Sequence, residues 1–187
     1  NSLVRIVGGN FRGRKLFAPD GHATRPTSDR TREALFNILR HGIRVEFKGA
    51  DILDLFAGSG ALGLEALSRG ATACTFIEQN KSAVKCIENN LAALALTERG
   101  TVLELNASQL PNRPADLPPA QLAFLDPPYG QGLAMTALTS LKQGNWLADR
   151  AVIVAETDSN EDFTAPAPYT LANQRTYGTT TISFLQV

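Results

Sequence analysis

Short apolar runs alternate with longer amphipathic stretches through most of the chain. Runs such as Ile52–Phe56 and Leu122–Leu125 have the length and composition of buried strands. Between the runs, apolar residues recur at helical spacing, as at Ala83, Cys86 and Ile87. Strands that alternate with helices predict parallel βαβ units, and therefore an α/β fold with a Rossmann-like, doubly wound sheet. We expect strands at residues 52–56, 73–78, 101–105, 122–125 and 151–155, and helices at 61–68, 82–96 and 133–141.

The C-terminal part of the chain departs from this alternation. Residues 169–176 and 179–185 have the composition of two strands that turn at Gly178. We expect an antiparallel hairpin there, which brings the mostly parallel sheet to seven strands.

The N-terminal part departs from it as well. Residues 4–7 and 14–17 predict a short hairpin rich in Arg. A helix over residues 31–40 follows, for which Thr27 or Ser28 is a suitable cap. The main sheet is therefore preceded by a small hairpin and one helix.

The formal net charge of zero hides an uneven distribution along the chain. Residues 1–48 hold ten Lys and Arg against four Asp and Glu, a net charge of +6, whereas residues 49–187 hold eight against fourteen, a net charge of −6. A basic segment in front of an acidic body is typical of proteins that bind a polyanion such as nucleic acid. The alternative is a strip of solvated surface charge.

From the charge asymmetry we predict two parts of the chain. Residues 1–48 form a basic extension that packs on the main domain and binds nucleic acid, and residues 49–187 form the main domain.

The composition excludes several classes of protein. A hydrophobic content of 43% and a charged content of 19% are those of an ordinary globular domain. No stretch approaches the roughly 20 apolar residues of a membrane span. Cys74 and Cys86 have neither metal-binding nor redox spacing, so we expect small core residues of a cytoplasmic protein. The two His are isolated, and no metal site is predicted.

One short motif carries the most specific chemistry. Asp126, Pro127, Pro128 and Tyr129 follow the apolar run 122–125, and the two prolines end the strand because they cannot extend its hydrogen-bond ladder. A carboxylate, a free backbone carbonyl and an aromatic ring therefore lie at the carboxyl end of a strand, where open α/β sheets bind ligands. These groups suit the capture of a planar molecule that bears an NH2 group. A turn with a helix-capping Asp is the alternative interpretation.

A second motif lies at the first strand-to-helix turn of the main domain. Gly58, Gly60 and Gly63 have the spacing of a dinucleotide-binding fingerprint, in which glycines let the backbone approach a ligand. Glu78 ends the next strand, where a carboxylate can bind both hydroxyls of a ribose. Together these residues predict a nucleoside ligand; the glycines alone would also fit a tight turn.

The surrounding residues favour S-adenosylmethionine over NAD as that ligand. NAD places a pyrophosphate at the helix N-terminus, but the Asp54 carboxylate near this turn disfavours phosphate. A carboxylate suits an ammonium or a sulfonium group, and S-adenosylmethionine carries both. Asn106 and Ala107, after the third strand, are candidates for bonding the adenine edge. We expect cofactor contacts from Asp54, Phe56, Ala57, Gly58, Gly60, Glu78, Gln79, Asn106, Ala107 and Asp126.

Taken together, the motifs resemble those of a known family. Segment 54–60 followed by segment 126–129 is similar to class I methyltransferases that act on an exocyclic amine. Segments 5–15 and 25–39 narrow the resemblance to the RsmD family, bacterial enzymes that methylate N2 of one guanine in small-subunit ribosomal RNA. The resemblance covers essentially the whole chain. It departs from the broader class at Asn106, where many methyltransferases carry Asp, although an amide can still bond adenine.

The resemblance implies a function and a role for each motif. The protein would methylate the N2 amine of a guanine in 16S rRNA with S-adenosylmethionine, as a monomer, on an assembling small ribosomal subunit, without a metal or a membrane. Asp126 and the Pro127 carbonyl would accept the two N–H bonds of the amine, and Tyr129 would stack on the base. Phosphate contacts would come from Arg5, Arg12, Arg14, Lys15, Arg25 and Arg30.

Three other functions explain part of the sequence. A DNA adenine-N6 methyltransferase would share the motif at 126–129, but usually adds a target-recognition domain for which no segment is spare. A non-enzymatic RNA-binding module explains the basic extension but not the carboxylates Asp126 and Glu78 at strand ends. An NAD enzyme explains the glycines but not the proline turn.

Overall fold

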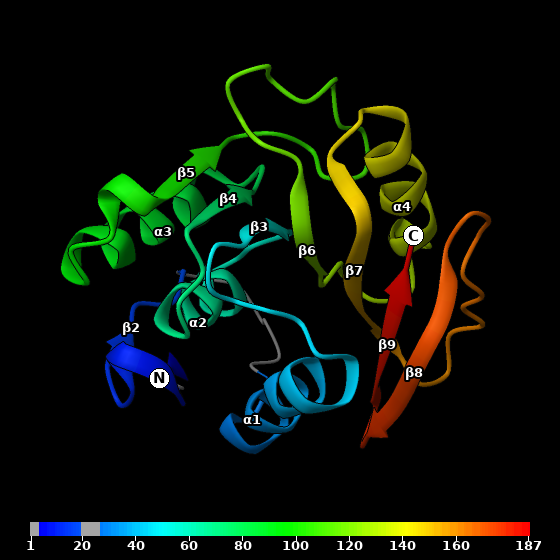
Figure 1. Ribbon diagram of the computed structural model, residues 1–187, viewed down its shortest axis with the longest axis horizontal. Helices are drawn as coiled ribbons and strands as arrows, with labels where there is room; N and C mark the ends of the chain where they lie inside the picture. Colours follow the sequence, from blue (N-terminus) through cyan, green and yellow to red (C-terminus); the bar gives the residue numbers. More distant parts are fainter. Residues whose placement is uncertain (1–3, 20–26) are drawn as a thin grey trace.

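The computed structural model describes residues 4–19 and 27–187, and its centre is a seven-stranded sheet (Figure 1). The strands of this sheet are β3 (Asp51–Leu55), β4 (Ala73–Ile77), β5 (Gly100–Leu103), β6 (Ala120–Leu125), β7 (Leu147–Asp158), β8 (Thr170–Tyr177) and β9 (Thr180–Gln186). The α-helices in the described residues are α1 (Asp29–Asn37), α2 (Ala61–Ser68), α3 (Lys81–Ala93) and α4 (Leu133–Gln143). Two short strands, β1 (Val4–Arg5) and β2 (Lys15–Leu16), form a separate antiparallel hairpin.

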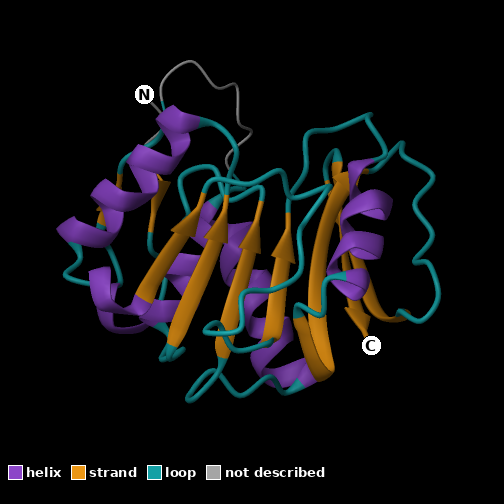
Figure 2. Cartoon of the chain, turned by 90° about the horizontal axis from the view of Figure 1, so that it is seen from above, coloured by secondary structure: helices purple, strands orange, loops and turns teal. Residues whose placement is uncertain are grey.

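The strand order β5-β4-β3-β6-β7-β9-β8 confirms the predicted doubly wound sheet. Strands β3 to β7 pair in parallel, and β9 is antiparallel to both β7 and β8. Figure 2 shows the parallel strands with their carboxyl ends along one edge. The chain reverses its direction of travel across the sheet between β3 and β6, and ligands of open α/β sheets bind beside such a switch point.

Both faces of the sheet are buried, which explains the continuous apolar runs. Successive residues of β6 belong to different cores, since Phe124 contributes to the cluster under α1, α2 and α3, and Leu125 to the cluster under α4. The same alternation holds in β7, where Val154 faces the first cluster and Ala155 the second. A side chain that directly follows one of these strands therefore has a defined face.

The N-terminal segment shares the first of these cores. Ile6, Leu16 and Phe36 are buried in the same cluster as residues of α2 and α3. The buried Glu65 carboxylate of α2 accepts the backbone N–H groups of Val7 and Gly8, each at 2.9 Å. These contacts fix the hairpin on the main sheet, whereas the division of the chain into two functional domains stays a prediction.

Several element boundaries differ from the predicted ones. The N-terminal hairpin has two paired residues in each strand instead of four, because a 3-10 turn at Gly9–Phe11 takes up part of the connection. Helix α1 starts at Asp29, with Ser28 as its cap, and continues as a π-helix at Ile38–Ile43, three residues past the predicted end at residue 40. Strand β7 extends beyond the predicted residues 151–155 at both ends, because Leu147 pairs with Ala120 of β6 and residues 152–158 pair with β9.

Candidate active site

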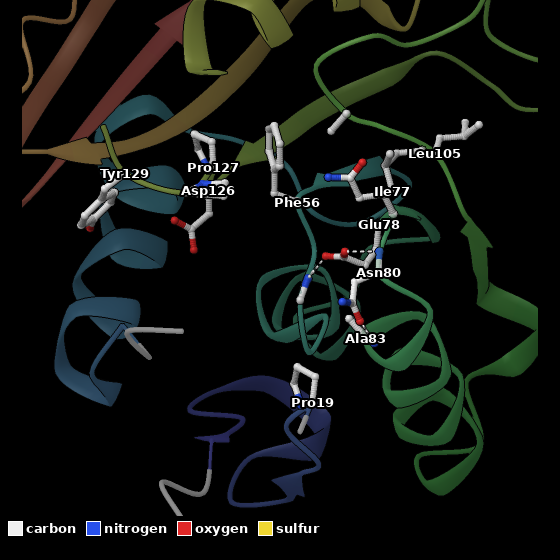
Figure 3. Close-up of a pocket in the computed structure, with 14 residues that line it drawn as sticks. Pro19, Phe56, Ile77, Glu78, Asn80, Ala83, Leu105, Asp126, Pro127 and Tyr129 are labelled. Carbon is white, nitrogen blue, oxygen red and sulfur yellow. Dashed lines mark hydrogen bonds between the residues drawn. The ribbon is translucent and has the colours of Figure 1, made fainter. Parts of the chain in front are cut away.

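A pocket of about 800 Å³ lies at the carboxyl edge of the parallel strands. Its lining comes from the ends of β3, β4, β5 and β6, from the start of α3 and from one residue of the N-terminal extension. The lining residues are Pro19, Phe56, Gly58, Ile77, Glu78, Gln79, Asn80, Ala83, Leu105, Ala107, Asp126, Pro127, Pro128 and Tyr129. Figure 3 shows Asp126 and Tyr129 grouped at one end of the pocket and Glu78, Ile77 and Leu105 at the other.

Glu78 anchors the first end. Its carboxylate accepts the backbone N–H of Gly58 at 2.9 Å and that of Asn80 at 2.8 Å, one on each oxygen (Figure 3). These bonds hold the tip of β4 to the glycine turn after β3. Because each carboxylate oxygen can accept a further bond, both oxygens can still meet a pair of neighbouring hydroxyls. Asn80 in turn caps α3 by accepting the N–H of Ala83 at 3.0 Å.

The glycine turn is shaped by two different constraints. Gly58 and Gly60 have φ of +59° and +80°, a conformation that favours glycine. Gly63 lies in α2 with ordinary helical geometry, but a Cβ there would come within 2.5 Å of the Phe76 ring. The glycine at this position therefore allows α2 to pack on β4, as the third glycine of the fingerprint does.

Asp54 does not line the pocket. Its carboxyl is buried and accepts the N–H of Gly63 at 3.0 Å, so it satisfies a free donor in the first turn of α2. Burial raises the pKa of Asp54 well above its ordinary value, against the lowering effect of the Gly63 hydrogen bond. Because Asp54 does not face the pocket, its carboxylate gives no reason to favour S-adenosylmethionine over NAD.

Three other predicted cofactor contacts lie outside the lining in the described part of the chain. Gly60 is the N-cap of α2 and bonds its N–H to the Ala57 carbonyl at 2.8 Å. The Asn106 side chain accepts the N–H of Ser108 at 3.0 Å and its hydroxyl at 2.7 Å, which stabilises the turn after β5. Its neighbour Ala107 does line the pocket, whereas contacts of Ala57, Gly60 and Asn106 with a ligand stay predictions.

The other end of the pocket is built by the predicted motif at residues 126–129. Asp126, Pro127, Pro128 and Tyr129 all line it, directly after β6. The Tyr129 hydroxyl lies 2.7 Å from the Thr180 hydroxyl at the start of β9, so the closing hairpin helps to orient the ring.

A second carboxyl, which sequence reasoning missed, lies against this end. Glu156 of β7 is buried and is hydrogen-bonded to Asp126. Burial raises the pKa of Asp126 from 3.8 to about 6, against the hydrogen bond from Glu156, which lowers it. Burial, followed by the charge and hydrogen bond of Asp126, raises the pKa of Glu156 well above its ordinary 4.5. Both carboxyls therefore hold their protons more tightly than exposed carboxyls do.

The N-terminal extension reaches the pocket at Pro19 and contacts the neighbouring Glu156 carboxyl at Thr27. Pro19 lines the pocket, and the preceding backbone is held by the buried Asn90 of α3, which accepts the Phe17 N–H at 2.7 Å and donates to the Phe17 carbonyl at 3.0 Å. Asn90 also donates to the Ser59 carbonyl of the glycine turn at 2.9 Å. The Thr27 hydroxyl lies 3.4 Å from both oxygens of Glu156. No local pattern marks Pro19 or Asn90 as site residues, because their roles depend on tertiary contacts.

Some of the predicted phosphate-binding residues have partners within the protein. Arg12, Lys15 and Arg30 are exposed, whereas Arg5 pairs with Asp29 at 2.6 Å. Arg14 is exposed but donates to the carbonyl of Ala93, at the end of α3, at 3.0 Å. Arg25 lies outside the described residues.

The described residues contain no group of acidic, His and Cys side chains suited to a metal ion, and none of their helices is long and apolar enough to cross a membrane. Cys74 and Cys86 are buried, as predicted for core residues, and the Cys86 thiol donates to the Phe17 carbonyl at 3.1 Å.

Comparison with known proteins agrees with this arrangement. Over 94% of its length, the chain is 40% identical to Ribosomal RNA small subunit methyltransferase D of Escherichia coli K12, of which the match covers 85%. The Haemophilus influenzae protein of the same name is 38% identical over 94% of the chain and 89% of that relative. A family model described as Conserved hypothetical protein 95 matches residues 4–186. The chain belongs to the RsmD family of methyltransferases.

Solved structures of similar proteins share its fold. The solved structure of yhhF from Escherichia coli superposes with a TM-score of 0.82 at 38% identity and covers 99% of this chain and 98% of its own. HI0767 from Haemophilus influenzae superposes with a TM-score of 0.81 at 34% identity, again over 99% and 98% of the two chains. The likeness therefore includes the N-terminal extension as well as the sheet.

Proposed function

We propose that this RsmD-family protein transfers a methyl group from S-adenosylmethionine to the exocyclic N2 amine of a guanine in 16S rRNA. The observation that carries the proposal is one pocket with Glu78 at one end and Asp126 to Tyr129 at the other. The first end suits a nucleoside and the second a planar amine. Relatives named Ribosomal RNA small subunit methyltransferase D, which match over 94% of the chain, support rRNA as the substrate.

The residues of the first end fit S-adenosylmethionine. The Glu78 oxygens are held by backbone donors and retain lone pairs for two ribose hydroxyls. Ile77, Leu105 and Ala107 give the pocket an apolar wall that suits a purine. When bound, S-adenosylmethionine supplies an electrophilic methyl group on a sulfonium sulfur.

Asp126 and Pro127 perform the activation in this proposal. The lone pair of a guanine N2 amine is delocalised into the ring, so the amine is a poor nucleophile. The Asp126 carboxylate and the Pro127 carbonyl accept its two N–H bonds and favour a tetrahedral nitrogen with a free lone pair. Acceptors placed in advance around a developing positive charge are worth about 3 kcal/mol each. Tyr129 stacks on the base, which is worth about 1–3 kcal/mol.

The target base has to leave its stack to reach this pocket. The basic residues of the extension would hold the surrounding phosphates, and those described, Arg5, Arg12, Arg14, Lys15 and Arg30, are all exposed. Pro19 connects this extension to the pocket wall, so the phosphate contacts and the target amine can belong to one continuous RNA strand.

The product of the reaction tests the proposal. Purified protein would be incubated with isotopically labelled S-adenosylmethionine and, in parallel, 16S rRNA, small ribosomal subunits and duplex DNA, all lacking the modification. Mass spectrometry of the digested nucleosides should show N2-methylguanosine in the RNA or the subunits. N6-methyladenine in the DNA would establish the alternative of a DNA methyltransferase, and RNA binding without any methylation would establish a non-enzymatic module.

A further inference from the structure

The buried carboxyl of Glu156 has no assigned role in the reaction above. Its side chain is 2% exposed, near the C-terminal end of β7. Leu125 of β6 pairs in register with Ala155 of β7, so Asp126 and Glu156 are the next residues along two neighbouring parallel strands. Since side chains alternate between faces, both carboxyls lie on the face opposite α4.

The surroundings of Glu156 do not neutralise it with a positive charge. The groups that act on it in the described part of the chain are the carboxyls of Asp126 and Asp54 and the hydroxyl of Thr27. Ile182, its partner in β9, is buried and apolar. A buried carboxylate with only acidic neighbours is costly unless it holds a proton. A proton shared with Asp126 removes that cost.

The shared proton has a geometric consequence for Asp126. The side chains of Asp126 and Glu156 are hydrogen-bonded to each other, and this contact restrains the Asp126 carboxyl beside the pocket. Asp126 lines the pocket, whereas Glu156 does not.

We propose that Glu156 is a positioning residue, which donates a hydrogen bond to one oxygen of Asp126 and so aims the other oxygen at the N–H of the target amine. The inference rests on the proposed methyl transfer to an exocyclic amine.

Bonds and protons balance in this step. The N–C bond forms as the C–S bond of the donor breaks, and the electron pair of that bond stays on sulfur. The amine proton moves to the free oxygen of Asp126, which then holds one proton while Glu156 keeps its own. Release of the Asp126 proton to water restores the starting pair. Because Glu156 stays neutral throughout, no second buried charge is created.

Three substitutions separate donation from mere space filling. Glu156→Gln keeps the shape and an N–H donor, so kcat should stay within about threefold of wild type. Glu156→Leu keeps the bulk but removes the donor, and Glu156→Asp keeps a carboxyl but shortens its reach. Both should lower kcat by about tenfold to 100-fold, as the loss of a positioned group does, and leave KM for S-adenosylmethionine within about threefold. Asp158→Asn, two residues further along β7, is the matched control and should leave kcat unchanged.

The pH dependence gives a readout that a structural role would not move. Loss of the Glu156 donor removes the effect that lowers the pKa of Asp126. The acid limb of the kcat profile should therefore move to higher pH in Glu156→Leu and stay in place in Glu156→Gln. A ¹³C NMR titration of the Asp126 carboxyl should show the same displacement in protein alone, without cofactor or RNA.

The outcomes distinguish this inference from the proposed function. Wild-type protein that methylates no amine would contradict the proposed function, while the carboxyl titration would still report on the pair. An active wild type with an unmoved Asp126 titration in Glu156→Leu would overturn the inference. It would also be overturned if Glu156→Gln lost as much kcat as Glu156→Asp, a comparison that holds even if Glu156→Leu does not fold.

Discussion

At the β4 end of the pocket, the Glu78 carboxylate receives two backbone N–H bonds, whereas at the β6 end the Asp126 carboxyl has another carboxyl, Glu156, as its partner. Backbone donors replace water around Glu78 and hold its geometry, which suits a group that binds. Burial without such donors raises the pKa of Asp126 to about 6 and gives it an affinity for protons near neutral pH, which suits a group that accepts one. We therefore propose that the same chemical group serves two tasks because its neighbours differ.

Removal of Asp126 should produce the largest effect. Asp126→Ala deletes an acceptor aimed at the amine and should slow methyl transfer at least about 100-fold. Single-turnover kinetics with saturating cofactor measure this rate. Asp126→Asn, which keeps the shape but not the charge, should also be slow, and near-normal turnover in either variant would refute the role of Asp126.

Removal of Glu78 should affect binding instead of chemistry. The loss of a charged hydrogen bond costs about 1.5–3 kcal/mol, so Glu78→Ala should weaken the affinity for S-adenosylmethionine more than tenfold. Calorimetric titration provides the measurement. Glu88→Ala, which removes an exposed carboxylate from α3, is the control and should bind normally. Equal affinities of Glu78→Ala and wild type would mean that the ribose is held elsewhere.

The raised pKa values of Asp126 and Glu156 should make folding stability depend on pH. The folded-state pKa of Asp126, about 6, lies above the ordinary value of 3.8, and that of Glu156 is raised as well. Protons therefore bind more tightly to the folded state, and stability should fall as pH rises from about 4 through 6. Asp126→Asn should flatten this decline. Between low pH and pH 8, its free energy of unfolding should fall by about 1–3 kcal/mol less than that of wild type. Thermal unfolding between pH 4.5 and 8 gives the slope, and parallel curves for the two proteins would contradict the assigned pKa shifts.

The exposed basic surface should have the smallest effect per residue and should involve neither end of the pocket. Reversal of Arg12 and Arg14 to Glu should weaken RNA binding and reduce the salt dependence by a log–log slope of about 0.7 for each lost contact. Affinity for S-adenosylmethionine should not change. Filter binding at several salt concentrations measures the slope. The matched control reverses Lys142 and Arg175, on α4 and β8, and an equal effect in the control would show that the charge of the extension has no special role.

Strand-end reasoning explains why much of the fold and of the site could be predicted. Apolar runs predict the two strands that Asp126 and Glu78 directly follow, and both of these residues line the pocket. The same rule would have indicated Glu156, which directly follows the apolar run 151–155. It was missed because no motif accompanies it, and because β7 continues past it to pair with β9.

Other features depend on contacts that no local pattern contains. Asp54 and Asn106 have polar side chains at strand ends, but their bonds go to Gly63 and to Ser108. A sequence gives no indication of whether such a group turns to the pocket or to a neighbouring backbone donor. The position of Pro19 likewise depends on Asn90, which is distant in sequence.

We assign cofactor binding and methyl transfer to opposite ends of one pocket. The most direct test of this assignment measures S-adenosylmethionine affinity by calorimetry and the single-turnover rate of RNA methylation on the same preparations of wild type, Asp126→Ala and Glu78→Ala. Asp126→Ala should keep its affinity and lose the rate, whereas Glu78→Ala should lose its affinity and, at saturating cofactor, keep most of the rate. If Asp126→Ala lost affinity as strongly as Glu78→Ala, or if both retained the wild-type rate and affinity, the assignment of the two ends would be contradicted.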